Sequence, residues 1–393
     1  MNVFTHYLPV KIVFGSGSSK DIGQVLRDFG CRGLLITDRN ISKIGMAETM
    51  AGYIRDRDIE LDVYNQVDPS PSVQAVDKVV SDLRQEKFDF IVALGGGSVI
   101  DFSKAVSVII KQEGKVWDYV AAGQPAKRVV NKNTMPVIAI PTTAGTGSEV
   151  TPYSVLTNKE TDQKASLKSP FIFPRFAVVD PELTLSMPPG ITAISGIDAL
   201  AHAIEAYINI EKSTPMADMA ALESIRIIGK YLSPVVENGK DLAGRENMAW
   251  AAMLSGMAIS GSDTTTAHAL SVPLCARTGM PHGLAAGVLT SEVIRRSAGK
   301  ADDKFRDIAR AMKIDLSTVQ DDGVISRLAD EINTLTAKIG LKNEARRFFE
   351  SQEAVDIDIL TSDVLKYQFR SLEFHPKLFN RHDITAIYRS VFN

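Results

Sequence analysis

The chain has 393 residues, which is long for a single hydrophobic core, so we expect two domains. Its composition is that of a globular protein, with 45% hydrophobic and 23% charged residues and a formal net charge of −3. Lys and Arg are scattered along the chain, and this slightly acidic balance gives no electrostatic basis for binding nucleic acid or an acidic membrane surface.

The amino-terminal sequence and the number of cysteines indicate the cellular compartment. The amino-terminal sequence lacks the basic and then apolar pattern of a signal peptide. Apolar stretches such as Phe90–Leu94 are too short to span a bilayer. Two cysteines, Cys31 and Cys275, indicate a reducing compartment rather than a disulfide framework. We therefore expect a cytoplasmic protein that is not embedded in a membrane.

Strand-like and helix-like segments alternate in the first half of the chain. The expected strands are Lys11–Phe14, Gly33–Thr37, Leu61–Val67, Phe88–Leu94 and Pro136–Ile140. The expected helices are Ser19–Phe29, Met46–Arg57, Val73–Gln85 and a segment that ends near Ile110. Strands separated by helices of this length predict a mostly parallel sheet that is covered on both faces.

The pattern changes near Pro188. From there onward apolar residues recur at helical spacing and strand signals nearly vanish. The expected helices include Ile194–Tyr207, Met216–Leu232, Arg245–Gly261 and Ser326–Lys338. The sequence thus predicts an α/β, Rossmann-like domain over residues 1–187 and an all-α domain over residues 188–393.

A glycine-rich segment follows the strand Phe88–Leu94 and precedes a helix. It consists of Gly95, Gly96, Gly97 and Ser98, with Asp101 in the first turn of the helix. Glycines let the backbone approach a ligand, and a helix amino terminus offers unpaired N–H groups, so the segment suits a pyrophosphate. A tight turn without a ligand is the alternative. The segment does not contain the G-x-G-x-x-G fingerprint, so an ordinary Rossmann domain is not supported.

Two further segments point to a nucleotide. Asp38 follows the strand Gly33–Thr37, where a carboxylate can bind ribose hydroxyls and repel a 2′-phosphate, although aspartates in such loops often only cap a helix. Residues 141–151 are small and rich in hydroxyl groups, and they follow the apolar strand Pro136–Ile140. A solvated loop would have the same composition. We favour a ligand loop because a buried strand should place it at the binding edge of the sheet.

Polar residues interrupt an apolar helix in the second half. Asp198 and His202 are four residues apart and share one helix face. Burying an unpaired charge is expensive, so the two need a divalent cation or a hydrogen bond to each other, and the segment alone leaves both open. His268 and His282 lie in the same helical half. Together the four form an Asp and three-His set that suits Fe(II) or Zn(II) better than Mg or Ca.

These segments resemble the iron-containing, or group III, alcohol dehydrogenase family, and the resemblance extends over essentially the whole chain. The segments that carry it are Gly95–Asp101, Ile140–Glu149, Gly196–Glu205, His268–Leu270, Pro281–Gly283 and residues 383–388. The resemblance implies that the metal ligands are Asp198, His202, His268 and His282. It implies that the cofactor contacts are Asp38, Gly95, Gly96, Gly97, Ser98, Thr142, Thr143, Thr146 and Lys164, with Asp101 in the same segment.

The family also implies a fold and an activity. The fold is dehydroquinate-synthase-like, with a nucleotide-binding domain and a helical metal domain. The expected activity is NAD-dependent dehydrogenation of a small alcohol, or reduction of an aldehyde, with Fe(II) as the metal and Zn(II) as the alternative. Asp38 matches the family position that favours NAD over NADP. A homodimer or larger homo-oligomer is expected.

The chain departs from the family at Val272. Family members commonly carry a further histidine four residues after the third ligand, and that position is Val272 here. A role for that histidine cannot be transferred. Arg277 lies between His268 and His282. It is either a surface residue or a contact for an anionic tail on an aldehyde substrate.

Two other functions remain as alternatives. A lyase or polyol-phosphate enzyme of the related superfamily would share the glycine-rich segment and a metal, but such enzymes need a Lys and Arg cluster that is not evident near the ligands. An NAD-binding regulator without catalysis would not need four intact ligands.

Overall fold

The computed structural model describes residues 3–350 and 355–392, and its internal contacts divide the chain into two compact units. The sheet unit comprises Leu8–Thr143 and Ser148–Thr184. The helical unit comprises Ala144–Gly147, the chain from Leu185 onward and an amino-terminal segment that ends at Tyr7. The sequence-based division after residue 187 lies within three residues of the change from one unit to the other. Residues 144–147 belong to the helical unit although the segments on both sides belong to the sheet unit, and no pattern in the sequence predicts this.

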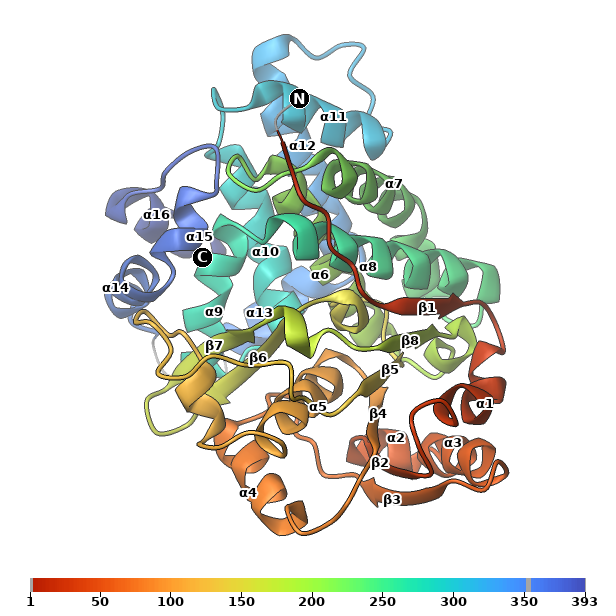
Figure 1. Cartoon of the computed structure of the whole chain (residues 1–393). Helices are drawn as coiled ribbons and strands as arrows, with labels where there is room; N and C mark the ends of the chain where they lie inside the picture. The colour runs from red at the N-terminus through yellow and green to blue at the C-terminus, as the bar shows by residue number, and fades with distance from the viewer. Residues whose placement is uncertain (1–2, 351–354, 393) are drawn as a thin grey trace. The chain divides into compact units, whose positions relative to one another are not determined.

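The sheet unit is built on a parallel sheet of six strands in the order β1-β8-β5-β4-β2-β3 (Figure 1). Its strands are β1 (Lys11–Phe14), β2 (Arg32–Ile36), β3 (Glu60–Tyr64), β4 (Phe90–Gly95), β5 (Val137–Pro141) and β8 (Phe176–Val179). The predicted parallel sheet is confirmed. The sequence analysis missed β8 and the antiparallel hairpin of β6 (Tyr153–Asn158) and β7 (Gln163–Lys168).

Helices cover both faces of this sheet, which explains why its central strands are apolar throughout. Leu34 and Ile91 belong to one buried cluster with residues of α4 and α5, whereas Leu35 and Val92 belong to another with residues of α3. The helices of this unit are α1 (Ile22–Leu26), α2 (Arg39–Lys43), α3 (Met46–Arg55), α4 (Val73–Leu83) and α5 (Gly97–Ile109). Every residue of β4 is buried, as a strand between two helical layers requires.

The strand order identifies where such a sheet binds ligands. From β2 the chain adds β3 on one side, and from β4 it adds β5 on the other. The order therefore reverses between β2 and β4. In open α/β sheets, the crevice outside the carboxyl ends of the strands at this reversal is the general ligand site.

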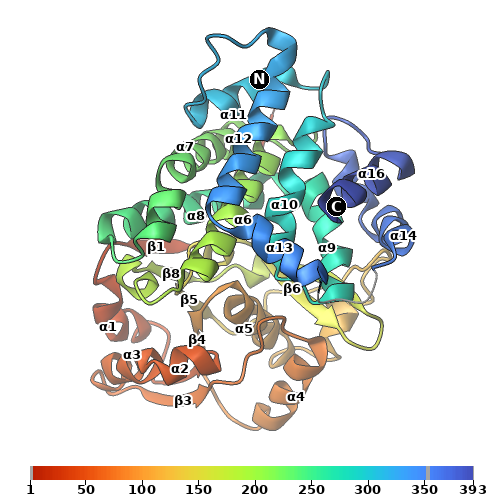
Figure 2. The same cartoon turned by 180° about the vertical axis from the view of Figure 1, so that it is seen from behind.

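The helical unit is arranged around α6 (Pro189–Ile208), which contacts α7, α8 and α10 (Figures 1 and 2). The other helices are α7 (Pro215–Glu237), α8 (Leu242–Ser262), α9 (Thr266–Thr278), α10 (His282–Arg295), α11 (Asp302–Ala311), α12 (Val324–Lys338), α13 (Leu341–Glu350), α14 (Ile357–Tyr367), α15 (Phe369–Glu373) and α16 (Arg381–Phe392). The predicted helical nature of this half is confirmed. Pro at the first helical position fits the start of both α6 and α7, because its fixed φ suits a helix and its missing N–H costs nothing there.

The expectation that the apolar stretches of this chain are too short to span a bilayer needs correction at α6. By length and composition alone, Pro189–Ile208 could cross a membrane, so the chain does contain an apolar stretch of that length. However, 83% of the apolar window is buried inside the protein. The same helix carries the buried carboxylates of Asp198 and Glu205 and the buried imidazole of His202. Burial on all sides is the property of a central core helix.

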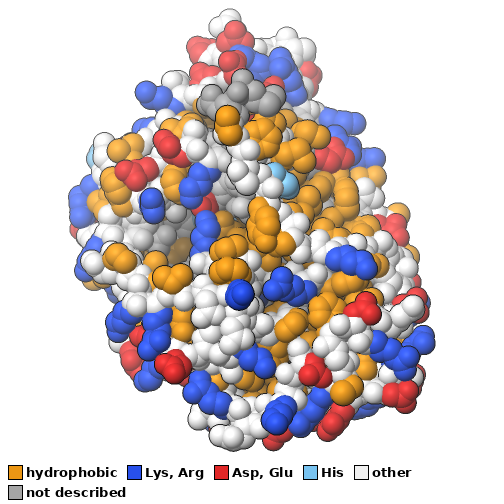
Figure 3. Space-filling view, viewed as in Figure 1, with side chains coloured by type: hydrophobic (Ala, Val, Ile, Leu, Met, Phe, Trp, Pro, Cys, Tyr) orange, Lys and Arg blue, Asp and Glu red, His pale blue; other side chains and the backbone are white. Residues whose placement is uncertain are grey.

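Charged side chains of both signs are interspersed on the face of the molecule in Figure 3. Exposed ion pairs of the protein include Arg295 with Asp330 at 2.7 Å and Arg306 with Asp321 at 2.8 Å. Exposed pairs of this kind contribute little to stability individually, so the functional argument rests on the buried charges instead.

Candidate metal centre and nucleotide-binding edge

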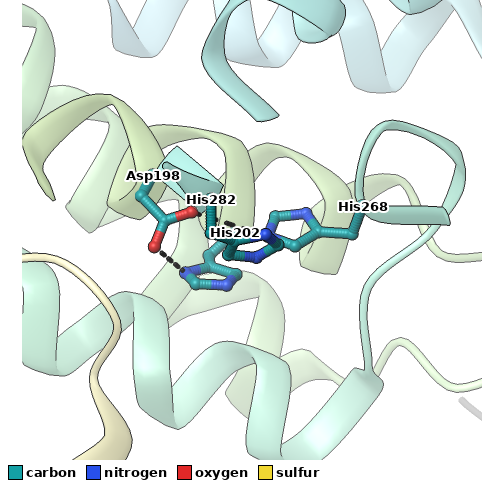
Figure 4. A group of neighbouring side chains, drawn as sticks. All are labelled: Asp198, His202, His268 and His282. Carbon is teal, nitrogen blue, oxygen red and sulfur yellow. Dashed lines mark ion pairs between the residues drawn. The ribbon is translucent and has the colours of Figure 1, made fainter. Parts of the chain in front are cut away.

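Four side chains from three helices converge in the helical unit (Figure 4). Asp198 and His202 lie one turn apart on α6, His268 lies in the first turn of α9, and His282 is the first residue of α10. Gly279, with φ +75°, ends α9 in the left-handed conformation, so the chain can reverse before α10 begins. The structure thus brings together all four predicted ligands.

The geometry of this cluster fits one metal ion. One ligand atom from each side chain lies within 4.8 Å of all the others. Bonds of about 2.0–2.2 Å to a common ion place two ligand atoms at most about 4.4 Å apart, so little adjustment is needed. Among the described residues, Asp198 Oδ1, His202 Nδ1 and His268 Nε2 are buried without a hydrogen-bond partner. Buried polar atoms are nearly always satisfied, so three orphaned atoms in one cluster call for a ligand outside the protein.

The cluster strongly perturbs the ionisation of its own members. Burial, the largest single effect, opposes the charged form of Asp198, but His202, His268 and His282 together outweigh it and hold the pKa of this carboxyl below its usual range. Burial lowers the pKa of His202 to about 4. Burial also acts to lower the pKa of His268, but the Glu205 and Asp198 carboxylates together outweigh it and raise the pKa of His268 to about 9. A metal can bind only the unprotonated nitrogen, so metal binding to His268 releases a proton.

Glu205 is a buried carboxylate whose role the sequence analysis missed. It lies on α6, seven residues after Asp198, and contacts His268 Nδ1. Its Oε1 atom also accepts hydrogen bonds from Thr265 Oγ1 at 2.9 Å and from the amide of Ala267 at 2.6 Å. A carboxylate on the far nitrogen fixes the tautomer of a ligating histidine and directs Nε2 at the metal. The spacing Asp198, His202, Glu205 along one helix face was the available sequence signal.

The segment 144–147, which belongs to the helical unit, also contacts one of the predicted metal ligands. The backbone of Gly145 makes a hydrogen bond with His202. A Cβ atom at Gly145 would lie 2.8 Å from the Ser195 backbone, so only glycine fits this approach. Thr146, a predicted cofactor contact, belongs to this segment of the helical unit, whereas the other predicted cofactor contacts belong to the sheet unit.

Most of the predicted cofactor residues lie at the carboxyl ends of β2, β4 and β5. Gly96 precedes α5, and no side chain caps this helix amino terminus. A Cβ atom at Gly96 would lie 3.1 Å from Thr143 Oγ1, and the amide of Thr142 donates to the carbonyl of Gly95 at 3.1 Å. The two predicted cofactor segments are therefore adjacent, beside an open helix amino terminus that suits a phosphate.

Asp38 lies where both of its proposed roles are possible. It follows β2, and its Oδ1 atom accepts hydrogen bonds from the amides of Asn40 and Ile41, so it caps α2. Asp38 is only half-buried. The neighbouring strand β4 leads into the glycine segment, so the carboxylate lies at the reversal of the strand order.

Comparisons with known proteins agree with this geometry. A family model described as iron-containing alcohol dehydrogenase matches residues 9–181, and the model of the carboxyl-terminal part of that family matches residues 192–392. The chain belongs to the iron-containing alcohol dehydrogenase family. It is therefore an oxidoreductase, and membership implies a nicotinamide cofactor and a metal.

Three relatives illustrate the range of this family. The chain is 37% identical over 314 residues to a choline dehydrogenase of Bacillus subtilis, covering 80% of this chain and 77% of the relative. It is 32% identical to a 1,3-propanediol dehydrogenase of Klebsiella pneumoniae, covering 99% of both chains. A crystal structure of sulfoacetaldehyde reductase from Bifidobacterium kashiwanohense in complex with NAD+ superimposes with a TM-score of 0.87 at 30% identity, covering 100% of both chains.

Within this alcohol dehydrogenase fold, Ser98 and Asp101 bond to other parts of the sheet unit. Ser98 Oγ donates to the carbonyl of Pro69 at 2.5 Å. Asp101 accepts hydrogen bonds from Ser148 Oγ at 2.6 Å and from the amide of Val155 at 2.9 Å. In this structure Asp101 therefore links α5 to the segment after β5 and to β6, and direct contact with the cofactor stays a prediction.

Lys104 forms a second link from α5 that the sequence analysis missed. Its side chain is fully buried, and Nζ lies within hydrogen-bonding distance of Ser148, Thr151 and Tyr153, through five oxygen atoms at 2.6–3.2 Å. Burial lowers the pKa of Lys104 to about 8, while Asp101 and Glu149 act in the opposite direction. The oxygens surround the ammonium as a ligand shell would, so this buried charge is satisfied by the protein itself.

Lys164, Arg277 and Val272 complete the predicted residues. Lys164 lies on β7 opposite Thr157. Burial raises the pKa of Asp101, and the charge of Lys164 is the smallest of the effects that oppose this rise. Arg277 lies in the last turn of α9, and its Nε atom pairs with Asp363 Oδ2 at 2.5 Å. This pair joins α9 to α14 and gives Arg277 a structural role; its role as a substrate contact stays a prediction. Val272 is half-buried on α9, one turn after His268.

Replacing one ligand should abolish stoichiometric metal binding. We expect His282→Ala to reduce the metal content from one ion per chain toward none, because the remaining three ligands hold the ion far less tightly. The far-ultraviolet circular dichroism should stay unchanged. His382→Ala, at an exposed position on α16, is the control and should keep the metal. Elemental analysis of both purified variants gives the answer, and full metal content in His282→Ala would contradict the ligand assignment.

Proposed function

We propose that this chain oxidises a small alcohol, or reduces the corresponding aldehyde, with NAD as the cofactor and Fe(II) bound by Asp198, His202, His268 and His282. Zn(II) is the alternative ion, since the same donor set suits both. The observation that carries the proposal is the cluster of four ligands with three orphaned, buried ligand atoms. When bound, the metal supplies Lewis acidity toward the substrate oxygen, and the nicotinamide exchanges a hydride with the carbinol carbon.

The residues of the helical unit set the charge of the centre. One carboxylate and three neutral imidazoles leave a divalent ion with a net positive charge, which preserves its attraction for a developing alkoxide. Glu205 holds His268 in the tautomer that presents Nε2. Asp198, His202 and His268 are buried, so water is largely excluded around them and their electrostatic interactions are strong. No side chain is assigned as the proton acceptor, because Val272 occupies the position of the additional family histidine.

The residues of the sheet unit support NAD as the cofactor. The uncapped amino terminus of α5, beside Gly96 and Thr143, suits the pyrophosphate. The Asp38 carboxylate at the end of β2 suits ribose hydroxyls and disfavours the 2′-phosphate of NADP. The proposal further includes a cytoplasmic location and a homodimer or larger homo-oligomer.

Family membership decides between the functional classes left open by the sequence. The alternative that the chain is a lyase or a polyol-phosphate enzyme is not favoured, because both halves of the chain match the alcohol dehydrogenase family. The four convergent ligands likewise favour an active enzyme over a regulator that only binds NAD.

A reductase for an aldehyde with an anionic tail is a second candidate. Two sulfoacetaldehyde reductases are among the relatives, at 32% and 30% identity, and their name denotes a substrate with a sulfonate. The choline dehydrogenase at 37% identity is named for a cationic substrate, so the family does not fix the charge of the substrate. Arg277 is five residues from His282, and in this second candidate function its guanidinium binds the anionic tail in addition to pairing with Asp363.

The main proposal is tested by restoring activity with metal. The protein is stripped with a chelator and then supplied separately with Fe(II), Zn(II) or Mg(II). NAD-linked turnover is followed on a panel of neutral, anionic and cationic alcohols and aldehydes. We expect turnover with Fe(II) or Zn(II) but not with Mg(II), because three imidazoles select against a hard cation. Full turnover by protein shown to be free of metal would contradict the mechanism.

The cofactor preference tests Asp38. Asp38→Asn keeps the side chain that caps α2 but removes the charge, so it should lower the ratio of kcat/KM for NAD to that for NADP. The expected change is about 1–3 kcal/mol, or about tenfold for each 1.4 kcal/mol. Asp38→Gly should relax the preference similarly, since glycine is also tolerated at the start of a helix. A wild-type protein that prefers NADP would show that Asp38 is misassigned.

The second candidate function is tested at Arg277. If the guanidinium pairs with an anionic tail, Arg277→Ala should lower kcat/KM for charged aldehydes by about 1.5–3 kcal/mol and leave neutral aldehydes unchanged. Asp363→Asn is the matched control, because it removes the same ion pair while keeping the guanidinium. Equal losses for charged and neutral aldehydes would assign Arg277 a purely structural role.

A further inference from the structure

A chain of buried hydrogen bonds leads from the metal ligand His268 to a histidine that the proposed function does not use. Glu205 contacts His268 Nδ1, and Thr265 Oγ1 lies 2.9 Å from Glu205 Oε1. The same hydroxyl lies 3.2 Å from His375 Nδ1, and His375 Nε2 lies 2.8 Å from Ser297 Oγ. Glu205, Thr265, His375 and Ser297 are each at most 1% exposed.

The chain joins elements that are distant in the sequence. Glu205 comes from α6, and Thr265 is the residue before α9. Ser297 lies in the turn after α10, and His375 lies in the segment after α15. Packing alone does not require polar side chains at these positions, and burying them has a cost unless they are hydrogen-bonded. What they share is one series of hydrogen bonds that ends at Glu205, and Glu205 contacts the predicted metal ligand His268.

This series of hydrogen bonds has fewer donor hydrogens than contacts that require a hydrogen. Four contacts need a hydrogen: Glu205 with Thr265, Thr265 with His375, His375 with Ser297, and Ser297 Oγ with the carbonyl of Val293 at 2.7 Å. Two hydroxyls and one neutral imidazole supply three hydrogens. Burial lowers the pKa of His375 to about 4, which keeps the ring neutral at ordinary pH. One of the four contacts therefore always lacks a hydrogen.

The tautomer of His375 decides whether the Thr265 hydroxyl has a second acceptor that competes with Glu205. With the hydrogen on Nδ1, the ring donates to Thr265 Oγ1, and the hydroxyl hydrogen of Thr265 is directed to Glu205. With the hydrogen on Nε2, the ring donates to Ser297, and Nδ1 becomes an acceptor that competes with Glu205 for the Thr265 hydroxyl. A carboxylate binds its donor more strongly than a neutral ring nitrogen does, so Glu205 favours the first arrangement.

We propose that His375 is a positioning residue for the metal centre, which acts through the Thr265 hydroxyl and the Glu205 carboxylate to hold His268 in its ligating orientation. This inference rests on the proposed metal site. Outer partners of metal-bound histidines commonly change metal affinity by about 10–100-fold when they are removed. His375 extends that influence two hydrogen bonds beyond the carboxylate.

The test compares Co(II) binding by paired variants. Co(II) is used as the probe because its visible absorption bands report the geometry of its ligands. Thr265→Val removes the hydroxyl and should raise the Kd for Co(II) about 10–100-fold and alter the absorption bands. Thr265→Ser keeps the hydroxyl and should bind within about threefold of the wild type. Melting temperatures of the metal-free proteins are measured for every variant, so that lost stability is not mistaken for lost affinity.

A second pair distinguishes positioning from simple packing at His375. The amide of asparagine takes the place of Nδ1, so His375→Asn can still donate to Thr265. The amide of glutamine takes the place of Nε2, so His375→Gln keeps only the contact with Ser297. We expect the Kd for Co(II) to rise about 3–10-fold in His375→Gln and to change less in His375→Asn. If His375 only stabilises the packing, the two variants should have the same Kd for Co(II), whatever their melting temperatures.

The outcomes separate this inference from the proposed function. If the wild type does not bind Co(II), the metal site itself is wrong. If the wild type binds Co(II), and Thr265→Val and His375→Gln bind it as tightly as their partner variants, the metal site stands and the role of His375 is overturned. If Thr265→Val does not fold, the His375 pair decides alone.

Discussion

The structure depends on how the central helix of the helical unit accommodates buried charge. α6 is buried on almost every side, yet it carries Asp198, His202 and Glu205 along one face. The two carboxylates solve the problem differently. Glu205 is satisfied within the protein by the side chain of His268, the Thr265 hydroxyl and backbone amides. Asp198 Oδ1 has no hydrogen-bond partner and lies among nitrogens that include orphaned atoms. That difference separates the atoms that would hold a metal from those that would support it.

The sheet unit offers an internal comparison. Lys104 is as deeply buried as any ligand, but five oxygens from the chain surround its ammonium group. A buried charge with a complete shell stabilises a particular arrangement of the backbone. A buried cluster without one indicates a missing cation. The same chain thus shows a charge satisfied by the fold and a cluster that the fold leaves open, and the contrast supports a metal at the second.

Links around Lys104 and Asp101 also explain how one helix can organise a cofactor edge. α5 begins at the glycine segment, and its next two turns bond to Ser148, Val155 and Tyr153. The segments that follow β5 and that form β6 are therefore tied to the helix whose amino terminus suits a phosphate. Such links fix relative positions without contacting a ligand, which is why residue type alone cannot distinguish them from binding residues.

The sequence by itself determined the features that depend on local pattern. Apolar strands and helical spacing indicated the two structural classes, and the spacing of Asp198 and His202, taken together with His268 and His282, predicted a metal site. Only the tertiary structure decided what depends on contacts between distant residues. It showed that Glu205 supports His268 from 63 residues away and that Asp101 is bonded to Ser148. It also added β8 and the β6–β7 hairpin to the fold. Periodicity reports which face of an element is buried, whereas the partner of a buried polar group is set by the path of the whole chain.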